Sequence, residues 1–404
     1  MNDIRKELRV EIESPYFDEA YALALTDPAI PDWLTEEHLY FLSKECGILP
    51  HTFDLLLKAR RILVGEPALC LLTKTVYHIL AKRKKYAESF TAFSLPEVPS
   101  EEKRIAYELF VAFPVLAHAR ITWEELLARG VDRDVATDSL LWTDSFLKEA
   151  EEKHGHPCYP KEYFAAYSVG IYVDSLIIGR LRFQIGENYE RPVRVFKSKS
   201  GAFRALMDNT LLHPSGHVLG SYGCEDETDA YPASLTETTD TYEGYAVNPE
   251  TGLAEHIRTR LSKSEWTPVF TSGDTVLRVH IPGGKKLDHD ACIASYARAK
   301  ELFGRCYPEY RFTAFMIGCW MLSPVLREIL SPTSNILAFA SDYTVFPIKN
   351  NALDAFGYVF GIHPASPAEI DLSALPEDNS IRRGIKAKSI EGKFIHQFGG
   401  FMEY

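Results

Sequence analysis

The 404-residue sequence lacks any apolar run long enough to cross a membrane. A membrane helix needs about 18 or more nearly consecutive apolar residues, and polar or charged residues interrupt every stretch before that length. The first residues, Met-Asn-Asp-Ile-Arg-Lys-Glu-Leu, also lack the apolar region of an export signal. We therefore expect a cytoplasmic protein with no membrane partner.

Basic residues are also in short supply. The chain has 44 Lys and Arg against 56 Asp and Glu, which gives a formal net charge of -12. Such a surface repels nucleic acids and anionic lipids outside a local basic patch. The run Lys82-Arg83-Lys84-Lys85 follows an apolar segment ending at Leu80, and cations are favoured at a helix C-terminus. We interpret the run as a solvated face and expect no nucleic-acid partner.

Paired cysteines are missing as well. The seven cysteines are scattered and form no CxxC motif, so neither a disulfide framework nor a zinc module is indicated. The segment His154-Gly155-His156-Pro157-Cys158 offers metal-ligand side chains, but no second ligand group at a recognisable spacing follows it. A plain turn is the alternative that we adopt, and we assign no metal.

Length and periodicity indicate two domains. Apolar residues recur at three- and four-residue steps almost throughout the first 155 residues, including a helix expected over Asp132–Lys153. The Gly/Pro/His/Cys segment then breaks this pattern, and β-type alternation follows from Leu176. We predict an α+β protein with an all-helical domain at 1–158 and a mixed α/β domain at 159–404.

The most informative stretch of the second domain is a strand, a glycine turn and a helix. Val276–Ile281 reads as a buried strand, Gly283-Gly284-Lys285-Lys286 as a turn, and Asp288 as the cap of the helix that follows. Amide groups of such a turn and the helix dipole both favour an anion, and two lysines add positive charge. A phosphate site is one interpretation. A tight turn with two solvated lysines is the other.

The remaining elements follow from apolar runs and turn residues. Tyr310–Trp320 reads as a strand buried on both faces, and we expect it to pair with Val276–Ile281. If the two are parallel, ligands belong at their carboxyl ends, where Gly283-Gly284 and Trp320–Ser323 would meet. We further expect a helix from Ser323-Pro324 to Leu330. Closing strands are expected at Tyr343–Ile348 and Tyr358–Ile362, and a mobile extension from Pro364 with a last element near Phe394–Phe401.

These residues resemble a family of bacterial proteins that join a helical N-acyltransferase-type N-terminal domain to a GNAT-like acyltransferase C-terminal domain. The resemblance spans most of residues 175–345. Its motifs are Gly179-Arg180-Leu181-Arg182-Phe183, the stretch Gly273–Pro282, Ser295 in the helix, Pro308, Trp320-Met321-Leu322-Ser323-Pro324 and Ser334-Asn335-Ile336.

The resemblance implies a GNAT-like fold and transfer of an acyl group from a coenzyme A thioester, acetyl-CoA or a longer acyl-CoA, to an amine on a small molecule or peptide. In that superfamily the pyrophosphate binds a loop patterned Gln/Arg-x-x-Gly-x-Gly/Ala. The matching residues here run from His280 to Lys285, with His280 and Lys285 departing from the pattern. The resemblance thus implies cofactor binding by Ile281, Gly283, Gly284, Lys285 and Lys286.

Acyl transfer to an amine needs a base, a polarised carbonyl and an acid for the thiolate. His280 has a suitable pKa range for the base, although a strand-end histidine that only holds a loop is an equal alternative. Ser323, Asn335 or Tyr343 could donate to the sulfur, and Cys319 is more simply a core residue than a nucleophile. A catalytically inactive GNAT-like binding module is the alternative function. A hydrolase using the acidic Glu225–Glu243 region is a third.

Overall fold

The computed structural model describes residues 4–82, 90, 92–159 and 172–404. The chain divides into two compact units, residues 1–178 with 302–307, and residues 179–301 with 308–404. The domain boundary expected at 158/159 lies beside residues outside the described ranges and stays a prediction. Residues 83–85 of the basic run also lie outside them.

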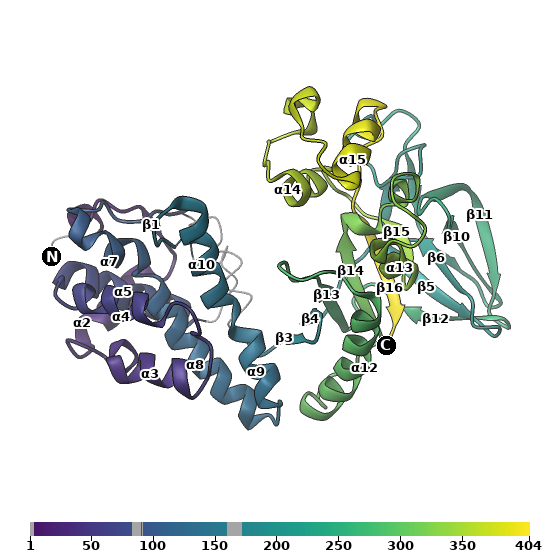
Figure 1. Ribbon diagram of the computed structural model, residues 1–404. Coiled ribbons are helices and arrows are strands. Elements are labelled where there is room, and N and C mark those ends of the chain that lie inside the picture. The colour runs from purple at the N-terminus through teal and green to yellow at the C-terminus, as the bar shows by residue number, and fades with distance from the viewer. Residues whose placement is uncertain (1–3, 83–89, 91, 160–171) are drawn as a thin grey trace. The chain divides into compact units, whose positions relative to one another are not determined.

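The first unit is helical in its described part, as the periodicity predicted (Figure 1). Thr35 caps a helix by accepting the amide of His38 at 3.2 Å, and Pro67 begins another, where its missing N–H costs nothing. The helices are α1 (Ile4–Glu7), α2 (Phe17–Thr26), α3 (Glu36–Lys44), α4 (Phe53–Leu63), α5 (Pro67–Leu80), α7 (Arg104–Leu109), α8 (Ala112–Ala128), α9 (Arg133–Leu140) and α10 (Trp142–His154), with the short strands β1 (Ile12–Glu13) and β2 (Ala92–Phe93).

Two features of this unit differ from the sequence expectation. The helix expected over Asp132–Lys153 is broken into α9 and α10. The Thr143 hydroxyl donates to the Leu140 carbonyl at 2.8 Å, which is the carbonyl that a continuous helix would offer to the amide four residues on. In addition, Glu101–Ala128 is long and apolar enough to cross a membrane, but 83% of its most apolar window is buried. That burial is the pattern of a core helix.

The second unit contains an antiparallel sheet in the order β11-β10-β6-β5-β12, with β9 also paired to β10. Its strands are β5 (Val193–Ser198), β6 (Phe203–Met207), β9 (Thr236–Glu237), β10 (Thr241–Val247), β11 (Ala254–Ser262) and β12 (Trp266–Phe270). A hairpin of β7 (Thr210–Leu212) and β8 (Tyr231–Ala233) accompanies it.

The other sheet of this unit runs in the order β15-β16-β14-β13-β4. Its strands are β4 (Leu181–Gly186), β13 (Val276–His280), β14 (Ala314–Cys319), β15 (Thr344–Pro347) and β16 (Phe398–Glu403), and β4 follows β3 (Ser175–Ile178). The expected pairing is confirmed, because β13 and β14 are parallel. Helix α12 (His289–Cys306) connects them (Figure 1).

Each face of this sheet is covered within the second unit. Tyr296 of α12 packs against Phe183 and Phe315, with ring centroids 5.9 and 5.1 Å apart. The opposite face shares a core with the antiparallel sheet, in which Val276 and Met316 are fully buried. Because side chains alternate along a strand, residues of β13 and β4 face these two environments in turn.

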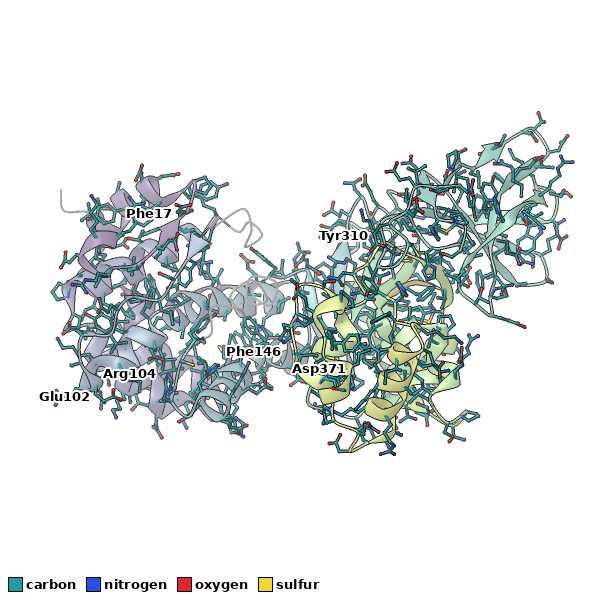
Figure 2. The ribbon with its side chains drawn as sticks, turned by 90° about the horizontal axis from the view of Figure 1, so that it is seen from above. Phe17, Glu102, Arg104, Phe146, Tyr310 and Asp371 are labelled. Atoms are coloured by element: carbon teal, nitrogen blue, oxygen red, sulfur yellow. The ribbon has the colours of Figure 1, made fainter. Side chains whose placement is uncertain are left out.

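The C-terminal region forms regular elements, so the mobile extension predicted from Pro364 is wrong, whereas β16 (Phe398–Glu403) confirms in part the last element expected near Phe394–Phe401. It contains α15 (Ser380–Ile390) and β16, and β16 lies between β14 and β15 in the sheet. Asp371, labelled in Figure 2, accepts the amide of Ser373 at 3.0 Å in a local turn. The strand expected at Tyr358–Ile362 is also wrong, because α14 (Asp354–Phe360) covers most of it and buries Phe356.

Shorter elements complete this region. Ser323-Pro324 begins a 3₁₀ turn over Pro324–Glu328 rather than a full helix to Leu330. Ser334 caps α13 (Asn335–Ser341) by accepting the amide of Ile336 at 3.2 Å. The strand expected at Tyr343–Ile348 is confirmed as β15.

Gly399 of β16 provides a test of this placement, because a Cβ there would lie 2.2 Å from Cε2 of Phe346 on β15. Gly399→Ala should lower the free energy of unfolding by about 1–3 kcal/mol through overpacking, measured by urea denaturation. Gly304→Ala in α12 is the control. Apart from the backbone of α12 itself, no atom of the described residues lies within 4 Å of its added Cβ, so the helix should gain slightly in stability. Equal stabilities of the two variants would contradict this position of β16.

Candidate functional site

The parallel strands β13 and β14 separate at their carboxyl ends. Among the described residues their pairing is confined to Leu277 with Phe315 and Arg278 with Met316. Beyond this point β13 stays paired with β4 as far as His280, and β14 stays paired with β16 as far as Cys319. Each strand therefore keeps its outer neighbour while its inner edge opens. Backbone groups along the opening are free to bond an extended ligand.

The turn after β13 leads directly into α12. Asp288 caps the helix, because its Oδ1 accepts the amide of Ala291 at 2.9 Å, as predicted. No described residue accepts a hydrogen bond from the amides of Gly283 to Leu287. Gly284 has φ +79°, a left-handed conformation that favours glycine. The turn thus carries several unpaired amides beside a helix N-terminus, where negative charge is favoured.

Arg180, at the start of β4, fixes the conformation of this turn. Its guanidinium donates to three backbone carbonyls, those of Pro282 at 2.9 Å, Lys285 at 2.7 Å and Lys286 at 2.9 Å. Three carbonyls of the turn are thereby drawn to one point. The amides between them are left without a partner, which suits the turn to an anion.

Ser295 of α12 holds Arg180 in place in turn. Its hydroxyl accepts the Arg180 amide at 2.8 Å and donates to the Ala291 carbonyl at 2.6 Å. Gly179, with φ +64°, must be glycine here, since a Cβ would lie 2.6 Å from the Ser295 hydroxyl. The motif residues Gly179, Arg180 and Ser295 therefore act together, a role that sequence reasoning did not assign to them.

A cleft of about 490 Å³ lies over this arrangement. Its lining is rich in cations from the turn, from α12 and from the start of β4, with a single carboxylate, that of Asp288. The residues are Gly179, Arg180, Lys285, Lys286, Asp288, Ala291, Ala294, Ser295 and Arg298. Lys285 and Lys286, both exposed, were predicted to lie here. The cleft is a local positive site on a chain of net negative charge.

His280 lies on the face of the sheet opposite α12. Gln184 Oε1 is 3.3 Å from Arg278 Nη1 and 3.3 Å from His280 Nε2. A guanidinium can only donate, so the Gln184 atom between the two side chains is the acceptor oxygen. His280 Nε2 must then carry the hydrogen, which leaves the lone pair on Nδ1. Gln184 thus sets the tautomer of His280.

The environment of His280 keeps its imidazole neutral. Burial and the positive charges of Arg278 and Arg182 lower the pKa of His280 to about 4. Arg182 is its cross-strand neighbour on β4. On β14, Gly318 lies two residues after Met316, the partner of Arg278, so it is on the same face of the sheet, where Ile348 Cδ1 and Arg191 Nη2 lie near the position that a Cβ would take. His280 is therefore neutral at pH 7 and keeps a lone pair on Nδ1.

The other predicted donors are divided between locations. Ser323, just after β14, is buried, and neither its hydroxyl nor the indole N–H of Trp320 has a partner among the described residues. Tyr343 is buried on the α12 face, where its hydroxyl bonds that of Tyr296, and burial raises its pKa. Asn335 is the first residue of α13 and is half-buried. Ser323 thus follows the short 3₁₀ turn Trp320–Leu322 after β14, whereas Tyr343 lies on the α12 face of the sheet with Tyr296.

Cys319, weighed as a nucleophile, accepts the amide of Met321 at 3.3 Å through its sulfur. Burial raises the pKa of its thiol to about 12, so almost no thiolate exists at neutral pH. The acidic region has structural partners instead. Glu225 accepts the Gly223 amide at 3.0 Å, and Glu243 pairs with Arg260 at 2.7 Å. These carboxylates serve turns and strand pairing.

Glu108, His156 and Cys158 lie together in the first unit, with ligand atoms within 4.8 Å of one another. The turn residues 156 and 158 were considered as ligands from sequence, but Glu108 of α7 was not. Arg104, labelled in Figure 2, donates to Glu108 at 3.0 Å, and His156 Nε2 lies 2.9 Å from the same carboxylate. Ion pairing of a mostly buried carboxylate accounts for this cluster.

A splayed parallel strand pair, a turn with unpaired amides and the following helix define a GNAT-like domain. The model of the GNAT-like C-terminal domain family matches residues 176–402, more than half of the chain. The chain belongs to this family, and the resemblance found in its sequence is confirmed. None of the curated protein sequences matches it.

Several solved acyltransferase structures share the fold over the whole chain. A mutant in complex with octanoyl-CoA has 18% identity and a TM-score of 0.59, covering 99% of this chain and 98% of that chain. An acyltransferase in complex with decanoyl-CoA and teicoplanin has 17% identity and a TM-score of 0.60, with the same coverage. One in complex with CoA and 10C-teicoplanin has 18% identity and a TM-score of 0.59.

The neutral state of His280 predicts a pH dependence of stability. Its pKa is about 4 in the folded protein against an ordinary value of 6.5, so the unfolded chain binds more protons between these values. Stability from this group is complete above about pH 6.5 and is lost as the pH falls towards about 4. His280→Asn should therefore lose less stability than the wild type between about pH 7 and about pH 4.5 in urea titrations.

The exposed His363, replaced by Asn in parallel, controls for loss of an imidazole as such. An unchanged pH dependence in His280→Asn would contradict the buried neutral state of His280.

Proposed function

We propose that the protein is an N-acyltransferase that moves an acyl group from a coenzyme A thioester to an amine of a small molecule or peptide. The observation that carries this proposal is the opening between β13 and β14, which ends at a turn with unpaired amides. The shared fold with acyltransferases that bind octanoyl-CoA, decanoyl-CoA or CoA supports it.

The residues present fit such a donor. Amides of Gly283 to Leu287 and the Lys285 and Lys286 side chains would hold the pyrophosphate, in the manner of other helix N-terminal sites. The departures from the usual loop pattern are accommodated. Arg180 fixes the turn through hydrogen bonds to its carbonyls. His280, which replaces the usual Gln or Arg, lies on the face of the sheet opposite α12 and bonds Gln184 there. The thioester supplies an activated carbonyl with a thiolate leaving group.

The reaction needs one proton removed and one proton returned. Nδ1 of His280 accepts the proton of the attacking amine, because Nε2 is committed to Gln184. Nearby arginines also favour the neutral amine over its ammonium form by charge repulsion. The buried hydroxyl of Ser323, which lacks a partner among the described residues, would donate a hydrogen bond to the departing thiolate, and the proton taken up by His280 Nδ1 is then released to the thiolate or to solvent. Asn335 and Tyr343 have no step in this scheme.

The phosphate-binding turn is tested by Gly283→Asp combined with Lys285→Glu. Both positions are exposed, and beyond its chain neighbours no atom in the described part of the chain lies within 4 Å of a Cβ on Gly283, so the fold should be kept. Three units of added negative charge at the turn should weaken coenzyme A binding by about 100-fold or more in calorimetry.

The matched control is Gly304→Asp with Lys58→Glu, which makes the same two kinds of change at exposed positions outside the cleft. It should bind coenzyme A as the wild type does. Equal affinity of the two double variants would sink the assignment of this turn to the phosphates.

The role of His280 is tested by His280→Gln. Loss of a positioned base should lower kcat by about 10²–10⁴-fold while the affinity for the acyl-CoA is kept, measured by thiol release and calorimetry. The exposed His363→Gln serves as control. Binding of acyl-CoA by the wild type without turnover on a broad set of amines would instead identify a ligand-binding module.

A further inference from the structure

Two arginines on the side of the sheet that carries His280, Arg191 and Arg278, have no carboxylate partner among the described residues. No salt bridge in this part of the structure involves Arg191 or Arg278, and the Nε of Arg191 is buried without a hydrogen-bond partner. The Arg191 side chain donates to the carbonyl of its neighbour Glu190 at 3.0 Å, and the Arg278 side chain donates to Gln184 at 3.3 Å and hydrogen-bonds Tyr189, so neither meets a carboxylate among the described residues. Guanidinium groups withdrawn from water are normally paired with an anion.

Tyr189 holds these two arginines on one face of the sheet. The Cζ atoms of Arg191 and Arg278 lie 4.2 and 5.9 Å from the centroid of its ring. The ring is buried, so it attracts both cations without neutralising either. The two charges repel each other, and burial together with Arg278 lowers the pKa of Arg191. A bound anion would offset the repulsion between these two positive charges.

The cluster faces the opening between β13 and β14 from the side opposite α12. Arg278 and His280 are two residues apart, so they lie on the same face of β13, and both contact Gln184. Arg191 reaches across to β14, where its Nη2 lies 3.9 Å from the position that a Cβ on Gly318 would take. The donor cleft lies on the α12 side instead. The arginines therefore border the space from which an amine would approach His280.

We propose that the amine acceptor carries an anionic group, a carboxylate, sulfate or phosphate, which Arg191 and Arg278 bind beside His280. The planar guanidinium presents paired N–H donors that match such oxyanions, and two of them define the orientation of the acceptor. The inference rests on the proposed acyltransferase function and specifies its acceptor class. Arg191 and Arg278 act in it as binding residues, with His280 as the base.

The test compares amines that differ only in the anion, with octanoyl-CoA and acetyl-CoA as donors and thiol release as the readout. The pairs are phenylalanine with phenylalaninamide, and glucosamine with glucosamine 6-phosphate. In the wild type the anionic member of at least one pair should have a kcat/KM about 10- to 100-fold higher. The comparison of carboxylate with phosphate identifies which oxyanion is used.

Arg191→Gln should abolish this preference through the KM of the anionic acceptor, while calorimetry shows unchanged binding of octanoyl-CoA. Arg278→Gln should do the same and also lower turnover, since it frees Gln184. The exposed Arg311→Gln is the control and should keep the preference. A wild type without preference, or a preference that survives both substitutions, overturns the proposal.

A second measurement does not depend on turnover. At constant ionic strength, replacing chloride by sulfate should raise the melting temperature of the wild type more than that of Arg191→Gln or Arg278→Gln, because sulfate binds the cluster. Equal shifts in all three proteins overturn an anion site. If acyl-CoA fails to bind at all, the proposed function falls, while the sulfate result still decides whether the arginines form an anion site.

Discussion

The site depends on the parallel strands β13 and β14, which stop pairing with each other towards their carboxyl ends while each stays paired with its outer neighbour. Strand β4 follows β13 to His280, and β16 follows β14 to Cys319. An opening in the middle of a sheet would otherwise leave strands free to slip or close. The outer partners prevent this, since antiparallel pairing fixes register on both sides. The glycines of β16 contribute, because Gly399 and Gly400 let Phe346, Leu322 and Tyr343 approach its backbone.

The two sides of the opening differ in what their charged groups do. On the α12 side, Arg180 draws three carbonyls of the turn inwards and leaves amides, with Lys285 and Lys286, for an anion. On the other side, His280 is kept neutral among arginines. A chain with net charge -12 thus concentrates positive potential at one place, which favours anions there. In the proposed reaction the same charges would favour a neutral amine at His280.

Local signals predicted the central element from sequence. The β-branched run, the glycine turn and the Asp288 cap lie within about 15 residues of each other, and each has a local physical cause. The all-helical first part was predictable for the same reason. Resemblance supplied the GNAT-like fold, since spacing alone favoured a plain turn over a phosphate site.

What sequence did not predict depends on contacts between distant residues. Arg180 lies 102 positions before Pro282, and its role follows only from folding. Gln184 is 96 positions from His280, so the tautomer was equally hidden. Strand β16 carries glycine where strands usually carry β-branched residues, which masked its central place in the sheet. Tyr343 was predicted as a proton donor from its hydroxyl, yet packing places that hydroxyl against Tyr296 on the α12 face of the sheet.

Amide hydrogen exchange with and without saturating coenzyme A tests the account most directly. A ligand in the opening should slow exchange in two segments, Val279–Asp288 and Ile317–Ser323, which supply its two edges and the phosphate turn. The account predicts protection of both segments together, with little change in the antiparallel sheet. Protection confined to other parts of the chain, or none at saturating coenzyme A, would contradict it.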